Sequence, residues 1–185
     1  MQYPLISEYV KSDNLDMSTK ATEEERKEAL VDEWGVKYSK DGRRLLKAPQ
    51  KLDSTYSIKE GVKIICDSAF FGCYSLSEIV IPSSVTSIGN RAFNKCDSLR
   101  SVVISDGVTS IWNRAFDGCD SLSEIVIPSS VTNIGKDAFG GCVSLSEIVI
   151  PSSVTSIGDC AFRDCSFPYD LKQELISRFG EKIFG

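Results

Sequence analysis

Residues 75–96 read SLSEIVIPSSVTSIGNRAFNKC, and the same pattern returns at residues 98–119, 121–142 and 144–165. Successive copies begin 23 residues apart, and a degenerate copy precedes them between Tyr56 and Cys73. A fixed period in this range indicates a solenoid, in which each repeat forms one coil that buries its apolar side chains only against neighbouring coils. The sequence therefore predicts a stack of about five coils with a 23-residue period.

Each coil begins with the pattern of a strand that has one buried face. Ile79 and Ile81 alternate with Glu78 and Val80, which is the period of two that a half-buried strand shows. The apolar positions of this coil are Leu76, Ile79, Ile81, Val85, Ile88, Ala92, Phe93 and Cys96. One coil cannot bury them alone, so we expect the core to form between stacked coils.

The repeat I-P-x-x-V-x-x-I-G-x-x-A-F-x-x-C-x-x-L, carried by residues 56–165, resembles the BspA-like, treponemal type of bacterial leucine-rich repeat. Residues 36–46, VKYSKDGRRLL, resemble the hairpin that often opens such arrays, and Asp41-Gly42 is itself a strong hairpin-turn dipeptide. The resemblance implies an α/β repeat solenoid: a right-handed leucine-rich-repeat coil whose concave parallel sheet is formed by the Leu76-to-Pro82 segments. It also implies a bacterial protein, and family members studied as surface proteins act in adhesion.

The two ends of a solenoid expose its core and need caps. Thr22 and Glu25 form a capping-box pattern, and Gly35 after Trp34 is a typical helix stop, so we expect a helix before the hairpin. At the other end Pro168 replaces the expected leucine, and an amphipathic pattern follows up to Phe179. We expect that helix to cover the last coil; docking a partner is the alternative.

These features divide the chain into three parts. We expect an N-terminal helical and hairpin cap over residues 1–50, the leucine-rich-repeat solenoid over 51–165, and a C-terminal helical cap over 166–185.

The charge balance argues against two classes of partner. Lys and Arg total 21 against 26 Asp and Glu, giving a net charge of −5 without any basic run. We therefore expect no nucleic-acid binding, and the chain has no apolar stretch of about 18 residues that would insert into a membrane. Residues 1–16 show no secretory signal, which favours a cytoplasmic location, or a secreted or cell-surface one if a signal was removed.

Seven cysteines raise the question of disulfides or a metal. Five of them occupy the same place in successive coils: Cys73, Cys96, Cys119, Cys142 and Cys165. Stacked coils should hold their Cβ atoms about 4.8 Å apart, whereas a disulfide prefers roughly 3.8 Å. The chain has neither histidine nor paired C-x₂-C motifs, so we expect buried thiols and no metal or other cofactor. Cys66 and Cys160 lie outside the series and are the better candidates for accessible thiols.

The sequence offers little for catalysis. Without histidine there is no Ser-His or Cys-His pair, and no phosphate-binding loop of the G-x-x-x-x-G-K-[ST] form occurs. A carboxylate pair acting on a sugar needs two acids about 5 to 9 Å apart, and Glu124 and Glu147 on adjacent coils could meet that distance. We expect both to face solvent on a flat sheet, so we predict no enzyme and keep a glycosidase as a distant alternative.

A binding surface is better supported. The alternation places Val80, Val103, Val126 and Val149 on the outward face of the sheet, beside Glu78, Glu124 and Glu147. Exposed apolar patches often mark interaction sites, although valine also simply favours strands.

Trp112 replaces a residue that is Gly89, Gly135 and Gly158 in the other full coils. It is either a binding hot spot or a cover folded over Arg91 or Arg114 as a cation–π pair.

Together these features predict a non-enzymatic protein-interaction or scaffold module. Its partner would be another protein or a second copy of the chain. An adhesive or carbohydrate-binding module of a host-associated bacterium is the alternative, and such a module should depend more on Trp112 and the carboxylates.

Overall fold

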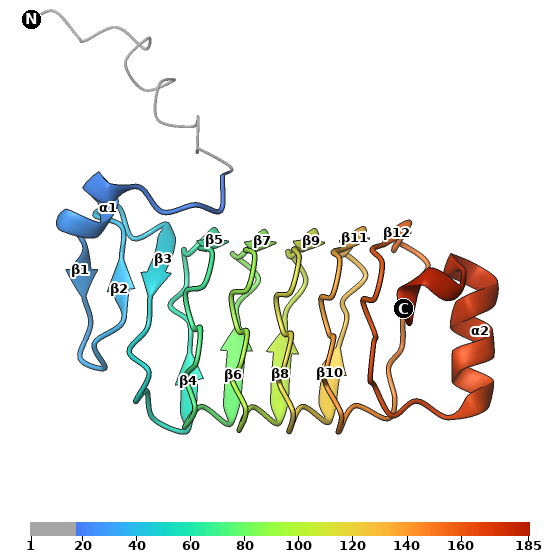
Figure 1. Ribbon diagram of the computed structural model, residues 1–185. Coiled ribbons are helices and arrows are strands. Elements are labelled where there is room, and N and C mark those ends of the chain that lie inside the picture. Colours follow the sequence, from blue (N-terminus) through green and yellow to red (C-terminus); the bar gives the residue numbers. More distant parts are fainter. Residues whose placement is uncertain (1–17) are drawn as a thin grey trace, which may run out of the picture.

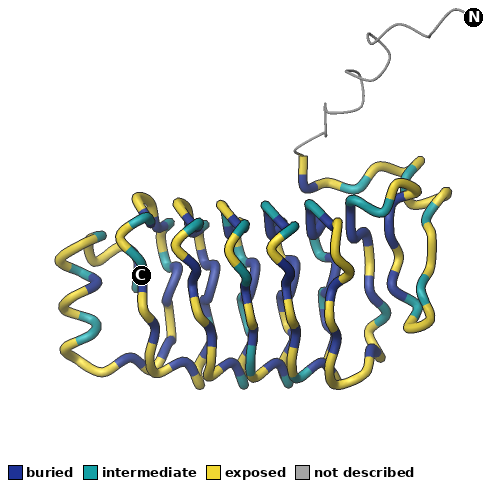
Figure 2. The backbone as a smooth tube through the Cα atoms, turned by 180° about the vertical axis from the view of Figure 1, so that it is seen from behind, coloured by how far each residue is buried: buried dark blue, intermediate teal, exposed yellow. Residues whose placement is uncertain are grey.

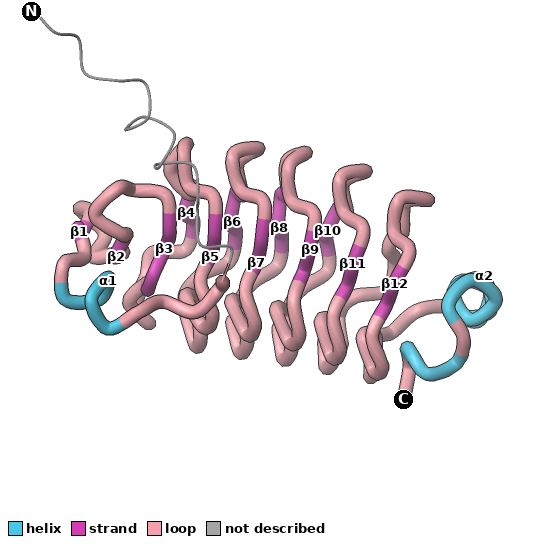
Figure 3. Tube along the Cα trace, turned by 90° about the horizontal axis from the view of Figure 1, so that it is seen from above, coloured by secondary structure: helices cyan, strands magenta, loops and turns pink. Residues whose placement is uncertain are grey.

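Two sheets run along the stack (Figures 1 and 3). Alternating apolar residues give most coils one strand in each sheet. The structure, a computed structural model, describes residues 18–185. The four-stranded sheet contains β4 (Thr55–Ser57), β6 (Glu78–Ile81), β8 (Ser101–Ile104) and β10 (Glu124–Val126). The eight-stranded sheet contains β5 (Ile64–Ile65), β7 (Ser87–Ile88), β9 (Ser110–Ile111), β11 (Asn133–Ile134) and β12 (Ser156–Ile157), together with three strands of the N-terminal region.

The register confirms the repeat over the coils. Glu78 lies opposite Ser101, and Ser101 lies opposite Glu124, so paired residues are 23 positions apart. Where the N-terminal hairpin joins the stack, Arg44 of the hairpin pairs with Ile64 of the first coil, a step of 20 residues. The 23-residue period therefore holds from the first coil onward but not at the entry to the stack.

The expected α/β class is wrong for the coils. Within residues 18–185, helices occur only at the two ends, and hydrogen-bonded turns carry the Ala-Phe segments that complete each coil. A turn suffices there because its N–H groups bond alternately within the turn and to the next coil: Ala92 N–H donates to Gly89 O at 3.2 Å, and Phe93 N–H donates to Ala115 O at 2.7 Å. The fold is a β-solenoid with short helical elements at its ends.

The core is a column of phenylalanine rings along the centre of the stack. Phe70, Phe93, Phe116, Phe139 and Phe162 are all fully buried. Successive ring centroids are 4.8, 5.0, 5.3 and 5.7 Å apart, and the rings are nearly parallel. Figure 2 shows the resulting pattern, in which buried and exposed residues alternate around every coil.

The N-terminal region is only partly as predicted. The Thr22–Glu25 capping box is present, but the helix α1 (Glu23–Lys27) ends well before Trp34. Leu30 and Val31 form a strand instead. That strand, β1 (Leu30–Val31), pairs antiparallel with β2 (Lys37–Tyr38), because the Asp32 carboxylate accepts N–H bonds from Trp34 and Val36 and turns the chain back.

The predicted hairpin at residues 36–46 is confirmed. β2 pairs antiparallel with β3 (Arg44–Lys47). Gly42 adopts a φ of +72°, which glycine tolerates at the turn without strain. The expectation that residues 1–16 hold no secretory signal lies outside the described residues.

Arg44 joins α1 and the residues just before it to β3, a role that the sequence did not reveal. Its guanidinium is almost fully buried and donates to Ser18 O and Lys20 O, both at 2.8 Å. Its Nε lies 2.7 Å from a carboxylate oxygen of Glu25. One buried cation thus holds three points of the N-terminal segment.

The C-terminal region covers the last coil as predicted. The helix α2 (Tyr169–Phe179) is followed by η3 (Glu181–Ile183), and Leu175 and Ile183 are buried. Cys160 N–H donates to Lys182 O at 2.7 Å and Phe162 N–H donates to Ile183 O at 2.8 Å. The η3 segment therefore accepts the hydrogen bonds that a further coil would accept. Neither α2 nor any other helix within residues 18–185 has the length and apolar character of a membrane span.

Candidate functional site

The four outward valines form one continuous row, which we call the valine stripe. Strand pairing sets Val80 beside Val103 and Val103 beside Val126. Their exposed fractions rise along the stack, from 41% at Val80 to 51%, 72% and finally 81% at Val149. The isoleucines that alternate with them are buried, so the outward placement expected from the alternation is confirmed.

The acidic residues flank this stripe as expected. Glu78, Glu124 and Glu147 are exposed, and the register places Ser101 between the first two. A general acid needs a surrounding that stabilises its protonated form, most often burial. The exposed positions of Glu124 and Glu147 do not provide that burial, so the arrangement suits charge recognition better than proton transfer.

The stripe ends in a groove at its C-terminal end. Residues 146–150 form no strand, and no hydrogen bond within residues 18–185 joins them to β10. The coils have also moved apart here, because the spacing of the phenylalanine rings is largest at this end. A hollow of about 370 Å³ lies between Val126, Val149, Glu124, Glu147 and Leu171 of α2.

Trp112 occupies a position that is glycine in the neighbouring full coils, where an added side chain would crowd the adjacent backbone. A Cβ atom at Gly135 would come within 2.6 Å of the backbone nitrogen of Asn113, and one at Gly158 within 2.4 Å of that of Lys136. Trp112 is nevertheless 45% exposed, and its indole N–H donates to Ser87 Oγ at 2.8 Å. Within residues 18–185 the ring makes no cation–π pair with Arg91 or Arg114, so that expectation is wrong.

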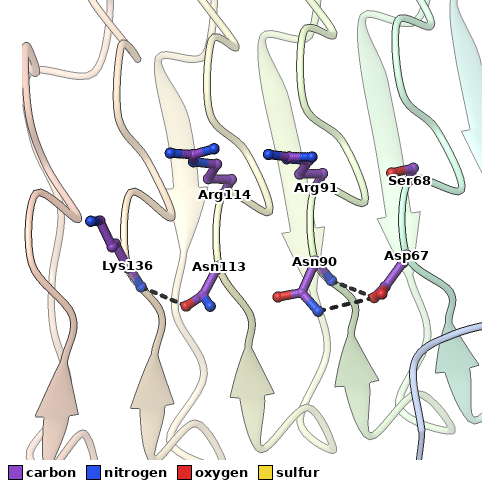
Figure 4. Close-up of a pocket in the computed structure, with 7 residues that line it drawn as sticks. All are labelled: Asp67, Ser68, Asn90, Arg91, Asn113, Arg114 and Lys136. Atoms are coloured by element: carbon purple, nitrogen blue, oxygen red, sulfur yellow. Dashed lines mark hydrogen bonds between the residues drawn. The ribbon is translucent and has the colours of Figure 1, made fainter.

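The substitution coincides with a missing link in a row of hydrogen bonds (Figure 4). Asn90 N–H donates to Asp67 Oδ1 at 2.8 Å, and Lys136 N–H donates to Asn113 Oδ1 at 2.9 Å. No corresponding bond joins Asn90 to Asn113 within the described chain. Trp112 immediately precedes Asn113, so the bulky residue lies beside the one absent side-chain bond of this row, while backbone bonds such as Arg91 N–H to Asn113 O at 3.0 Å still join the two coils.

Two adjoining hollows lie on this side of the molecule, and the sequence did not point to them as a pair. The first, of about 360 Å³, is lined by Arg91, Arg114 and Lys136 together with Asp67, Ser68, Asn90 and Asn113 (Figure 4). The second, of about 410 Å³, lies beside Trp112 over β9, β11 and β12 and shares Asn113 and Lys136 with the first. The recurrence of Asn-Arg-Ala-Phe at residues 90–93 and 113–116 is the sequence signal that could have found them.

The cysteines are free thiols, as predicted. In the series, each Sγ donates to a carbonyl of the preceding coil, for example Cys119 to Phe93 O at 3.1 Å. Burial raises the pKa of Cys119 and raises that of Cys142 well above its ordinary value. Cys160 is partly exposed, but Cys66 is fully buried, so the expectation of an accessible Cys66 thiol is wrong. No group of three metal-ligating side chains occurs within residues 18–185.

Comparison with known proteins places these features in a family. The sequence profile of the BspA type leucine rich repeat region matches residues 50–168 in six copies, one more than the coils expected. The comparison with curated proteins gave no match.

Solved structures of bacterial repeat proteins are similar to this chain. A leucine rich cell surface protein from Faecalibacterium prausnitzii A2-165 is 36% identical with a TM-score of 0.71, over 75% of this chain and 38% of that one. The T. pallidum Leucine Rich Repeat protein is 32% identical with a TM-score of 0.64, over 79% of this chain and 67% of that one. A leucine-rich repeat protein from Bacteroides ovatus ATCC 8483 is 33% identical with a TM-score of 0.59, over 75% and 38%.

The chain thus spans about two fifths of the length of the Faecalibacterium protein that it matches. The profile match covers well over half of the chain, and the two 23-residue sheet registers carry the repeat in three dimensions. The chain belongs to the BspA type leucine-rich repeat family.

Proposed function

We propose that the chain is a protein-binding module whose contact surface is the valine stripe with its flanking glutamates. The observation that carries this proposal is the exposure of four stacked valines, which rises to 81% at Val149. A continuous apolar row that no other part of the described chain covers has unfavourable contact with water, and a partner would remove that contact. The solenoid provides a rigid platform, so little ordering of the surface is needed on binding.

The partner that fits this surface is an apolar segment carrying basic residues. Valine side chains supply apolar contact, and Glu78, Glu124 and Glu147 supply negative charge at its border. The groove at Leu171 offers a hollow of about 370 Å³ in which one larger apolar side chain could be seated. A second copy of this chain offers the same acidic border, which would oppose self-association.

We further propose that the module is not an enzyme and acts at the cell surface as an adhesive unit. The Faecalibacterium relative is described as a cell surface protein, and this favours a surface location over the cytoplasmic one expected from the sequence. The chain spans only 38% of that relative, so the proposal concerns the repeat module alone.

Two neighbouring substitutions test the proposed surface. Val126→Lys should leave the thermal unfolding temperature within a few degrees of wild type, because the side chain is 72% exposed. Ile127→Lys should unfold the protein, because it places a charge in the core where Ile127 is 5% exposed.

Binding is then compared by pull-down from host and bacterial extracts, with the exposed Ser129→Lys as a charge-matched control. Val126→Lys should lose partners that wild type and Ser129→Lys retain. If Val126→Lys captures the same proteins as wild type, the stripe is not the contact surface.

A further inference from the structure

The side of the stack that carries Trp112 combines an aromatic ring, two glycines without side chains and a group of cations. Trp112 follows β9 in the eight-stranded sheet, whereas the valine stripe lies on the four-stranded one. Any ligand that binds here therefore binds independently of the proposed protein contact.

The first observation is that packing does not explain the tryptophan. The corresponding glycines of the next two coils leave less than 3 Å between an added Cβ atom and the neighbouring backbone. Trp112 stands at the equivalent position of its own coil, and the side-chain bond that would join Asn113 N–H to Asn90 is absent beside it within the described residues. A large ring that remains 45% exposed leaves almost half of its surface in contact with water, so packing alone does not account for its presence.

The second observation is that the ring is held in place. Its indole N–H is fixed at 2.8 Å to the oxygen of Ser87, a residue that is itself 6% exposed. An aromatic side chain held in this way loses little conformational entropy on binding.

The third observation is the surface beside the ring. Gly135 and Gly158 follow on the next two coils, so the floor of the 410 Å³ hollow carries no side chain at those positions. Serine, asparagine and aspartate side chains form its borders. A pyranose ring presents an apolar C–H face and a border of hydroxyls, which match an aromatic ring and such polar groups respectively.

The fourth observation is the charge of the adjoining hollow. Figure 4 shows the Arg91 and Arg114 side chains lying side by side on neighbouring coils, with Lys136 on the next coil. Arg114 pairs with Asp137 at 3.3 Å, whereas no ion pair within residues 18–185 engages Arg91 or Lys136. The carboxylate of Asp67 lines this hollow too and accepts two bonds from Asn90, so three cations lie near two carboxylates, Asp67 in the hollow and Asp137 paired with Arg114.

We propose that these two hollows form one site for an acidic saccharide. A sugar ring lies against Trp112, and a carboxylate or sulfate of the same or the next sugar is bound by Arg91, Arg114 and Lys136. One ligand can reach both parts because the hollows share Asn113 and Lys136. Nucleic acid fits less well, because its affinity comes largely from Lys and Arg contacts to many phosphates, and this protein offers three cations here and a net charge of −5.

Isothermal titration tests the site with three saccharide probes: tetragalacturonate for carboxylates, a chondroitin sulfate tetrasaccharide for sulfates, and maltotetraose as a neutral sugar. We expect saturable binding of at least one acidic probe, weakening as salt increases, and at least about tenfold weaker binding of maltotetraose. The stronger of the two acidic probes identifies the anion. Equal binding of the neutral sugar, or no binding of either acidic one, would overturn the proposal.

Three variants restore residues that other coils already carry, so they should fold. Trp112→Gly copies Gly89, Lys136→Asn copies Asn113, and Arg91→Ser copies Ser68. Trp112→Gly should weaken binding at least about tenfold, and each cation variant should weaken binding and reduce its salt dependence. Arg100→Ser, an exposed arginine outside both hollows, is the matched control and should bind like wild type.

Two further results would contradict the site. Unchanged affinity for the acidic saccharide in the folded Trp112→Gly variant would show that the indole ring is not part of the binding site. Tighter binding of an oligodeoxythymidine of equal charge than of the acidic saccharides would assign the site to single-stranded nucleic acid instead.

Discussion

The Sγ atom of Cys119 lies 3.1 Å from the carbonyl oxygen of Phe93 on the preceding coil and donates a hydrogen bond to it. Cys96, Cys142 and Cys165 repeat the contact with Phe70, Phe116 and Phe139. The cysteine of each coil therefore does two things at once: it fills space in the core, and it gives a carbonyl of the coil before a second hydrogen bond beside the backbone N–H that this carbonyl already accepts. Valine, a similarly small apolar residue, could do only the first.

Cys119→Ala should accordingly lower the free energy of unfolding by about 1 to 2 kcal/mol, through lost packing and the loss of one of the two hydrogen bonds that the Phe93 carbonyl accepts. Urea unfolding followed by circular dichroism measures this change. Cys160→Ala, at a partly exposed position, should cost less. In native protein a thiol reagent should label Cys160 and leave Cys119 unmodified; rapid labelling of Cys119 would contradict its burial.

Alkaline pH should destabilise the protein through its buried thiols. Burial raises the pKa of Cys66 from 9.0 to about 11 and that of Cys165 to about 12. Folding thus favours the protonated thiols, so their contribution is complete below about pH 9 and is lost as the pH rises toward about 11 to 12. Each such thiol adds up to about 1.4 kcal/mol per pH unit to the loss. Urea unfolding at several pH values gives the loss of unfolding free energy per pH unit, and this loss should be smaller in Cys66→Ala than in wild type. An unchanged loss would show that folding does not keep the Cys66 thiol protonated.

The sequence predicted the coils well because their structure depends on local alternation. Ile79 and Val80 have opposite exposures, as a period of two requires, and the 23-residue register follows from repeating that segment. The outward glutamates and valines of the candidate surface could be placed for the same reason.

Features that depend on what packs alongside a segment could not be predicted. Residues 75–86 and 144–155 have the same sequence, yet the first contains β6 and the second forms no strand in the four-stranded sheet. The difference is in the neighbours: the last coil meets α2, whose Arg178 donates to Ile150 O at 3.0 Å, instead of another coil. Likewise, Leu30 and Val31 read as helix from their apolar character, but the open edge beside β2 makes them a strand.

Arg44→Ala should destabilise the N-terminal cap by about 2 to 4 kcal/mol. The substitution removes the bonds to Ser18 and Lys20 and leaves the Glu25 carboxylate without its buried cation. The exposed Lys40→Ala, which breaks a surface ion pair with Glu28, should cost less than about 1 kcal/mol. Hydrogen exchange should show faster opening of α1 in Arg44→Ala than in Lys40→Ala, and equal protection of α1 in both would refute the anchoring role.

Gly158→Ala should lower the free energy of unfolding by about 1 to 3 kcal/mol, although alanine is usually tolerated in place of glycine. The added Cβ atom would lie 2.4 Å from the backbone nitrogen of Lys136, and its three nearest neighbours are all backbone atoms of the preceding coil, so no flexible side chain can move aside. Ser156→Ala, an exposed change two residues earlier, should alter stability by less than about 0.5 kcal/mol. Similar stabilities for both variants in urea unfolding would mean that the coils can separate here at no cost.

Removal of one whole repeat should leave a folded, shorter protein. Deleting residues 98–120 would bring Phe139 next to Phe93, a pair that matches the ring contacts of the stack. It would also place Glu124 opposite Glu78, where Ser101 now separates them; both carboxylates are exposed to solvent, so we expect this like-charge pair to cost little. The stack should shorten by one ring spacing, about 5 Å, because coils contact only their neighbours. Deleting about half as many residues should instead turn buried side chains outward and abolish cooperative unfolding, because the coils could no longer align their apolar positions. Circular dichroism and thermal unfolding of the two deletions decide the matter, and if both unfold alike, the coils do not behave as independent units of the stack.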